Sequence, residues 1–141
     1  MTRVFWDTML FLYLLEGNPQ FATRVREVLA RSYERGDLLL TSCLALGEVM
    51  AGGAGNYAKA ETTRATIVEM GFSFLPFELR CVDTFSRLRS EQRLKAPDSI
   101  NLASAGAAGV DVFLTGDIQL HKRGLHVPGI HIIADFNLPI L

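Results

Sequence analysis

Four acidic residues lie beside or within strongly apolar segments, where acids of a solvated surface are uncommon. If such carboxylates meet in the folded chain, their mutual repulsion requires a compensating cation. A ligand set made only of hard oxygen atoms favours Mg²⁺ or Mn²⁺ over zinc, and Mg²⁺ held by carboxylates is typical of phosphoryl chemistry. The four residues are Asp7, Glu48, Asp98 and Asp117.

Two of these acids follow predicted strands. Asp7 ends the apolar run at residues 3–7, and Asp117 follows residues 112–115 after a single glycine. The carboxyl ends of parallel strands meet at one edge of a sheet, so both acids are expected at that edge. Each also suits a purely structural role, Asp7 as a helix cap and Asp117 as a turn residue.

The other two acids belong to predicted helices. Asp98 opens residues 99–108, a helix rich in small residues, where its charge also suits the helix dipole. Glu48 lies in residues 44–50, on the same helix face as Leu44, with no basic residue close in sequence. Glu48 therefore either reaches solvent from the edge of the core or points into a polar cleft.

Apolar runs of strand length alternate with helical patterns along the chain. The alternation predicts βαβ units, an α/β fold and a central, mostly parallel sheet. Asn18 and Pro19 suit the start of a helix, and Ser42 suits the cap of another. Strands are predicted at residues 3–7, 38–41, 72–77, 112–115 and 130–134, and helices at residues 9–16, 18–35, 44–50, 56–70, 78–92 and 99–108.

Composition limits the class of protein. The 141 residues, 49% of them hydrophobic, are expected to form a single domain over residues 1–141 with a substantial core. The net charge of −1 does not indicate a nucleic-acid partner, so any RNA role depends on local patches or a metal. Two cysteines form no disulfide framework, which favours a reduced, cytoplasmic setting. No membrane span or signal peptide is expected.

The ordered set of motifs resembles the PIN domain family and, within it, VapC-like toxin ribonucleases. The resemblance covers nearly the whole chain and implies a three-layer α/β/α sandwich around a sheet of about five strands. It also implies a Mg²⁺- or Mn²⁺-dependent endoribonuclease site. It is carried by Phe5-Trp6-Asp7-Thr8 with Leu12-Tyr13-Leu14-Leu15, Ser42 with Leu46-Gly47-Glu48-Val49, Ala96-Pro97-Asp98-Ser99-Ile100-Asn101-Leu102-Ala103, and Leu114-Thr115-Gly116-Asp117.

The resemblance implies roles for individual residues. Asp7, Asp98 and Asp117 would hold one or two cations, directly or through water. Glu48 would complete the set or orient the attacking water, and Thr115 matches a supporting hydroxyl near the fourth acid. The predicted catalytic set is therefore the four acids, with Mg²⁺ or Mn²⁺ as cofactor.

Two positions depart from the family pattern. Met9 stands two residues after the first acid, where similar sequences have Asn, and Gly116 stands before the fourth acid, where Asn is common. Both changes affect the hydrogen bonds expected around the acids, and such bonds tune a metal site.

Basic residues flank two of the acids. Arg89, Arg93 and Lys95 precede Asp98 and are predicted to follow an RNA backbone. The pair at residues 122–123, just after the fourth acid, is a further candidate. An ordinary solvated surface is the alternative interpretation of all these charges.

The resemblance implies an RNA substrate, a small antitoxin partner and a homodimer, with no membrane partner. Residues 9–15, residues 51–55 and the apolar tail suit such contacts or the core equally well. One alternative is a haloacid dehalogenase-type phosphatase, but Met9 occupies the position of its second Asp. The other is a catalytically inactive PIN-like module that binds RNA or protein.

Overall fold

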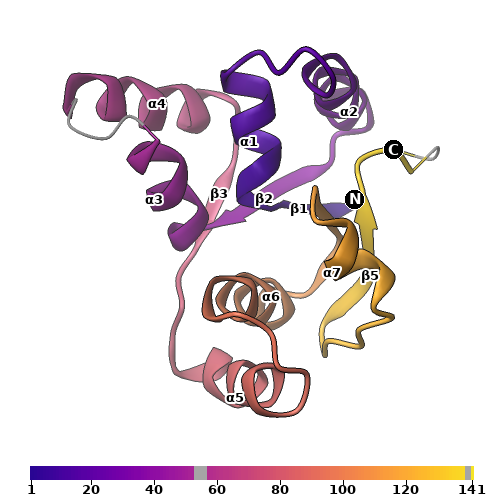
Figure 1. Cartoon of the computed structure of the whole chain (residues 1–141). Coiled ribbons are helices and arrows are strands. Elements are labelled where there is room, and N and C mark those ends of the chain that lie inside the picture. The colour runs from indigo at the N-terminus through magenta and orange to yellow at the C-terminus, as the bar shows by residue number, and fades with distance from the viewer. Residues whose placement is uncertain (53–56, 139–140) are drawn as a thin grey trace.

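The computed structural model describes residues 1–52, 57–138 and 141 (Figure 1). Five strands form one sheet in the order β3-β2-β1-β4-β5, and every neighbouring pair is parallel. The predicted, mostly parallel sheet is therefore confirmed, and all its carboxyl ends lie at one edge. The strands are β1 (Arg3–Trp6), β2 (Leu38–Ser42), β3 (Ser73–Leu75), β4 (Val110–Thr115) and β5 (Ile130–Asp135).

Helices flank the sheet on both faces, which confirms the α/β/α arrangement (Figure 1). One group of helices contains α1, α2, α3 and α4, and the other contains α5 and α6, with α7 beside β5. The helices are α1 (Thr8–Leu15), α2 (Ala22–Arg35), α3 (Cys43–Ala51), α4 (Tyr57–Glu69), α5 (Val82–Ser90), α6 (Ala96–Ala108) and α7 (Ile118–Lys122), and a 3₁₀ turn at Leu79–Cys81 precedes α5. Within these residues no helix combines the length and apolar character that crossing a bilayer requires.

The central strand β1 divides the core into two layers. Its side chains alternate, so Val4 and Trp6 join one hydrophobic cluster while Phe5 joins the other. Phe5 stacks on Phe113 of β4 with ring centroids 4.7 Å apart, and Trp6 packs against Phe11 of α1 at 5.1 Å. Burial on both faces explains why β1 is a continuous apolar run rather than an alternating one.

Several element boundaries differ from the sequence prediction. The second helix begins at Ala22, because residues 19–21 form a turn in which the Asn18 side chain accepts bonds from Gln20 N and Phe21 N. The predicted strand at residues 72–77 is reduced to three residues, and α7 was not predicted. The predicted glycine break at residues 51–55 and helix start at residue 56 fall largely outside the described residues.

Helix α6 is packed closely against the segment that leads into β5. A Cβ atom at Gly106 would lie 2.4 Å from the carbonyl oxygen of Pro128, closer than non-bonded atoms approach. Gly47 in α3 provides a contrast, because a Cβ atom there would meet nothing within 4 Å. The close approach at Gly106 therefore depends on the absence of a side chain.

We expect Gly106→Ala to lower the free energy of unfolding by roughly 2–4 kcal/mol, because backbone atoms of α6 or the segment before β5 must shift. The matched change Gly47→Ala should raise it by about 0.5–1 kcal/mol through helix propensity. Urea unfolding followed by circular dichroism measures both. Equal effects of the two changes would contradict the close approach.

Candidate active site at the carboxyl edge of the sheet

The carboxylate of Asp7 lies at the centre of the candidate site. Asp7 follows β1, caps the N-terminus of α1 and is only 8% exposed. Its Oδ1 accepts bonds from the Thr8 backbone N–H at 2.8 Å and from Asn101 Nδ2 at 3.2 Å. Its Oδ2 accepts a bond from the Thr115 hydroxyl at 2.9 Å. Asp7 therefore acts as a helix cap and is also fixed by residues far away in sequence.

A buried polar chain orients the Asn101 amide. Ser42, the N-cap of α3, accepts a bond from Ala45 N at 2.9 Å and donates its hydroxyl to Asn101 Oδ1. This contact places the Nδ2 group of Asn101 toward Asp7. Both residues lie in the quoted motifs, but neither was assigned a site role. Burial of a Ser and an Asn within apolar segments is the signal that would have identified them.

Thr115 links the first and fourth acids. It ends β4, is fully buried, and its hydroxyl donates to Asp7 while accepting a bond from Asp117 N at 3.0 Å. Asp117 is exposed and caps α7, because its Oδ1 accepts bonds from Gln119 N and Leu120 N at 2.9 and 3.3 Å. Capping uses only one oxygen of the Asp117 carboxylate, and Oδ2 is not part of the cap.

The two helical acids, Glu48 and Asp98, come from two different helices. Asp98 occupies the first turn of α6 and is half-buried. Glu48 of α3 is exposed, but its Oε1 accepts a bond from the Thr8 hydroxyl at 2.9 Å. Because Thr8 also donates its N–H to Asp7, it connects the first and second acids.

The carboxylates interact electrostatically. Burial raises the pKa of Asp7 to about 6, with further increases from Asp98 and Glu48 and opposition from the bonds of Thr8 and Thr115. Burial and the charge of Asp117 raise the pKa of Asp98, Lys95 opposes this, and Glu48 adds to it. Asp98 is therefore coupled to the other three acids, which the fold brings to one edge.

A cavity of about 280 Å³ opens beside two of the acids. Asp98 and Asp117 line it together with three basic residues, Arg93, Lys95 and Arg123. Asp7 and Glu48 do not belong to its lining. The predicted site residues thus form two groups. Asp7 and Thr115 are buried, whereas Asp98 and Asp117 line an open cavity together with basic residues.

The donor chemistry fits a hard divalent cation. All four acids offer oxygen atoms, and burial, together with the neighbouring carboxylates, raises the pKa of Asp7 and of Asp98. Across the described ranges, no group of three or more His, Cys, Asp or Glu side chains is arranged to hold a metal ion. Mg²⁺ retains several waters and takes only one or two carboxylates directly, so it does not require such a convergent group.

The two positions that depart from the family pattern, Met9 and Gly116, lie close together. A Cβ atom at Gly116 would lie 3.3 Å from Cβ of Met9 and 3.2 Å from Cε2 of Tyr13. Both neighbours belong to α1, the helix that Asp7 caps. A side chain at position 116 would therefore press on α1 beside the site.

Comparison with known proteins places these features in context. The PIN domain family model matches residues 4–124, a range that contains all four acids. No curated protein matches the chain. Among solved structures, DNA-bound VapBC from Salmonella typhimurium is 20% identical to this chain, with a TM-score of 0.70. The structural match covers 96% of this chain and 99% of the VapBC chain.

Two further solved structures share the fold. VapBC-1 from nontypeable Haemophilus influenzae is 16% identical with a TM-score of 0.71, covering 96% of this chain and 99% of that chain. VapC20 from Mycobacterium tuberculosis, described as a Sarcin-Ricin loop cleaving toxin, is 15% identical with a TM-score of 0.62. This match covers 89% of this chain and 99% of the VapC20 chain. At these identities, the likeness is one of fold.

We expect ionisation of Asp7 to destabilise the metal-free chain. The pKa of Asp7 is about 6 in the folded chain, against an ordinary value of 3.8. The contribution of protonated Asp7 to the free energy of unfolding is therefore complete below pH 3.8 and is lost as the pH rises through about 6. Asp7→Asn stays neutral. Relative to this variant, the unaltered chain should lose about 2 kcal/mol of unfolding free energy between about pH 4 and pH 7.

Denaturant unfolding in the presence of a chelator, repeated across this pH range, measures the difference. Asp83→Asn makes the same substitution at an exposed position in the first turn of α5 and is the matched control. A difference between Asp7→Asn and the unaltered chain that is constant with pH would contradict the prediction.

Proposed function

This chain belongs to the PIN domain family, and from that membership and its site we propose that it is a Mg²⁺- or Mn²⁺-dependent endoribonuclease. The observation that carries the proposal is the buried carboxylate of Asp7. It is held by Thr8, Thr115 and Asn101 at the carboxyl edge of a parallel sheet, where Asp98 and Glu48 act on it electrostatically. Buried, mutually coupled acids with perturbed pKa values are typical of catalytic sites.

The residues have separate tasks in the proposed hydrolysis. Asp7, Asp98 and Asp117 hold the divalent cation, directly or through water. When bound, the cation lowers the pKa of water and offsets negative charge on the phosphate. Glu48, positioned by the Thr8 hydroxyl, orients the attacking water and accepts its proton.

The polar chain behind Asp7 keeps its carboxylate in one orientation. Thr115 fixes Oδ2, while Thr8 and Asn101 fix Oδ1, and Ser42 fixes Asn101. A carboxylate held in this way needs little rearrangement when the cation and the substrate bind. Thr115 and Asn101 therefore act as positioning residues.

We further propose that the enzyme is a VapC-like toxin. Its fold likeness to proteins of VapBC systems extends over nearly the full length of both chains, which supports a small antitoxin partner, a homodimer and a cytoplasmic location. The Sarcin-Ricin loop cleaving activity described for VapC20 supports RNA as the substrate class. The near-neutral charge of this chain then assigns RNA binding to local basic residues.

A catalytically inactive PIN-like binding module is the second candidate. It is favoured by the apolar Met9 and by Gly116, which stand beside the acids and bring no polar side chain that supports a metal site. In that case the acids would keep only their structural roles, such as the caps made by Asp7 and Asp117. Cleavage and metal binding separate the two candidates.

We expect the unaltered chain to cleave single-stranded RNA with Mg²⁺ or Mn²⁺ and not with a chelator. Asp7→Asn and Asp98→Asn should each reduce the cleavage rate by about 100-fold or more, because each removes a charge that holds the cation. Gel analysis of a labelled RNA measures the rate. Asp83→Asn should cleave normally, and undiminished cleavage by Asp7→Asn would overturn the assignment.

Metal binding gives a test that does not depend on cleavage. Isothermal titration should detect Mn²⁺ binding that strengthens as the pH rises through about 6, because Asp7 must lose its proton before it can act as a ligand. Asp7→Asn or Asp98→Asn should abolish this binding, because each removes a carboxylate that holds the cation. Mn²⁺ affinity that is independent of pH and of both substitutions would favour the inactive module.

A further inference from the structure

The turn between α5 and α6 contains an unusual backbone conformation. Arg93 has φ of 55°, and within the described ranges it is the non-glycine residue with positive φ. Side chains disfavour this left-handed region, so the surrounding structure must impose it. Such imposed conformations often occur at functional sites.

Two other arginines impose this conformation. Arg89 of α5 donates from Nη1 to the carbonyl oxygen of Leu94 at 2.9 Å. Arg123, which follows α7, donates from Nη2 to the carbonyl oxygen of Gln92. These carbonyls belong to the residues on either side of Arg93. The turn is therefore held from both sides, and buried Leu94 anchors it further through a bond from its N–H to Leu88 O at 3.1 Å.

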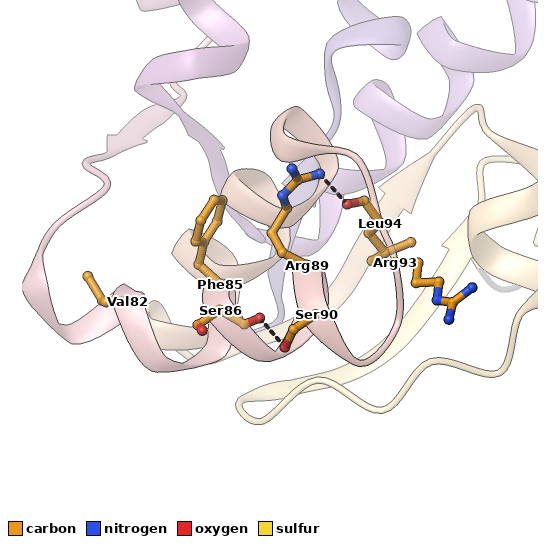
Figure 2. Close-up of a pocket in the computed structure, with 7 residues that line it drawn as sticks. All are labelled: Val82, Phe85, Ser86, Arg89, Ser90, Arg93 and Leu94. Atoms are coloured by element: carbon orange, nitrogen blue, oxygen red, sulfur yellow. Dashed lines mark hydrogen bonds between the residues drawn. The ribbon is translucent and has the colours of Figure 1, made fainter.

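The Arg93 side chain is left exposed by this arrangement. Figure 2 shows it extending away from Phe85 and Arg89, while Arg89 turns back to its bond with Leu94. Among the residues that the structure describes, none makes a hydrogen bond or ion pair with the Arg93 guanidinium. Arg89 and Arg93 were both expected to contact RNA, but their guanidinium groups are in different situations. The Arg89 guanidinium is hydrogen-bonded to the turn, whereas the Arg93 guanidinium is available to bind a ligand.

Arg93 occupies the junction of two hollows. It lines the cavity that contains Asp98 and Asp117, and it also lines a hollow of about 630 Å³ over α5 with Phe85. A ligand that fills both hollows must carry negative charge where it meets the Arg93 guanidinium. It must also be accompanied by a cation that offsets the charges of Asp98 and Asp117. A phosphodiester strand with a divalent ion meets both requirements.

We propose that Arg93 binds a backbone phosphate adjacent to the phosphate that is cleaved, and that Arg89 and Arg123 are positioning residues that set its turn. This inference rests on the proposed ribonuclease function and names one substrate contact within it. It assigns the strained turn a purpose, which is to place the Arg93 guanidinium between the hollow over α5 and the cavity lined by Asp98 and Asp117. The neighbouring hollow over α5 then receives the strand beyond that phosphate.

The test measures RNA binding without cleavage. All variants carry Glu48→Gln, which removes the proposed proton acceptor and leaves the three acids that hold the cation. Each variant is titrated, in the presence of Mg²⁺, into a labelled, short single-stranded RNA of mixed sequence while fluorescence anisotropy is recorded. Arg93→Gln should weaken binding about five- to tenfold and reduce the slope of log affinity against log salt by about 0.7, the value for one lost phosphate contact. Arg87→Gln, an exposed change elsewhere on α5, should leave the slope unchanged.

A second variant separates binding from folding. Arg93→Gly should weaken RNA binding as much as Arg93→Gln, yet be at least as stable to denaturant, because glycine adopts positive φ without strain. Loss of affinity in Arg93→Gln but not in Arg93→Gly would show that Arg93 acts through the turn alone, and would overturn the proposal.

A double-mutant cycle tests the role of Arg89. Arg89→Gln should weaken RNA binding when Arg93 is present and have little further effect in the Arg93→Gly background, because Arg89 acts through the turn. Additive losses would mean that Arg89 contacts RNA itself, and would overturn its positioning role.

Different experimental results would overturn the Arg93 contact and the proposed ribonuclease function. Normal RNA cleavage together with unchanged affinity and salt slope in Arg93→Gln would overturn the Arg93 contact alone. An unaltered chain that neither binds nor cleaves RNA would overturn the proposed function, and the Arg93 contact with it.

Discussion

The carboxylate of Asp7 is buried at the point where β1 ends, and its hydrogen-bond donors come from three separate parts of the chain. An acid in such surroundings is costly unless its oxygens are satisfied, so α1, β4 and α6 must all be correctly placed at once. The parallel sheet makes this possible, because neighbouring β1 and β4 deliver Asp7 and Thr115 to the same edge. The hydrogen bond between Thr115 and Asp7 therefore depends on the register in which β1 and β4 pair.

The proposed chemical roles of the acids at this edge are compatible with their structural roles. Asp7 and Asp117 each cap a helix, and each does so through Oδ1. Using one oxygen for the helix leaves the second for another contact, which Thr115 supplies in the case of Asp7. A capping role is therefore no argument against a role in binding a cation, and the raised pKa of Asp7 shows that the cap alone does not compensate its burial.

The sequence predicted features that depend on local pattern and missed those that depend on distant contacts. The strands and the common edge for Asp7 and Asp117 followed from hydrophobic runs and the parallel rule. The bond between Ser42 and Asn101 joins residues that only the folded sheet brings together. Helix α7 is only five residues long, and its cap resembled a turn. The positive φ of Arg93 had no sequence signal, because tertiary bonds rather than a glycine produce it.

The close approach of Met9 and Tyr13 to position 116 has a consequence for the packing of α1 beside the site. Position 116 carries no functional group, yet it separates α1, which begins after Asp7, from Asp117. A Cβ atom at position 116 would require Met9 and Tyr13 of α1 to give way by a few tenths of an ångström. Because residue 116 is a glycine, α1 lies against the segment between β4 and Asp117 without such a shift.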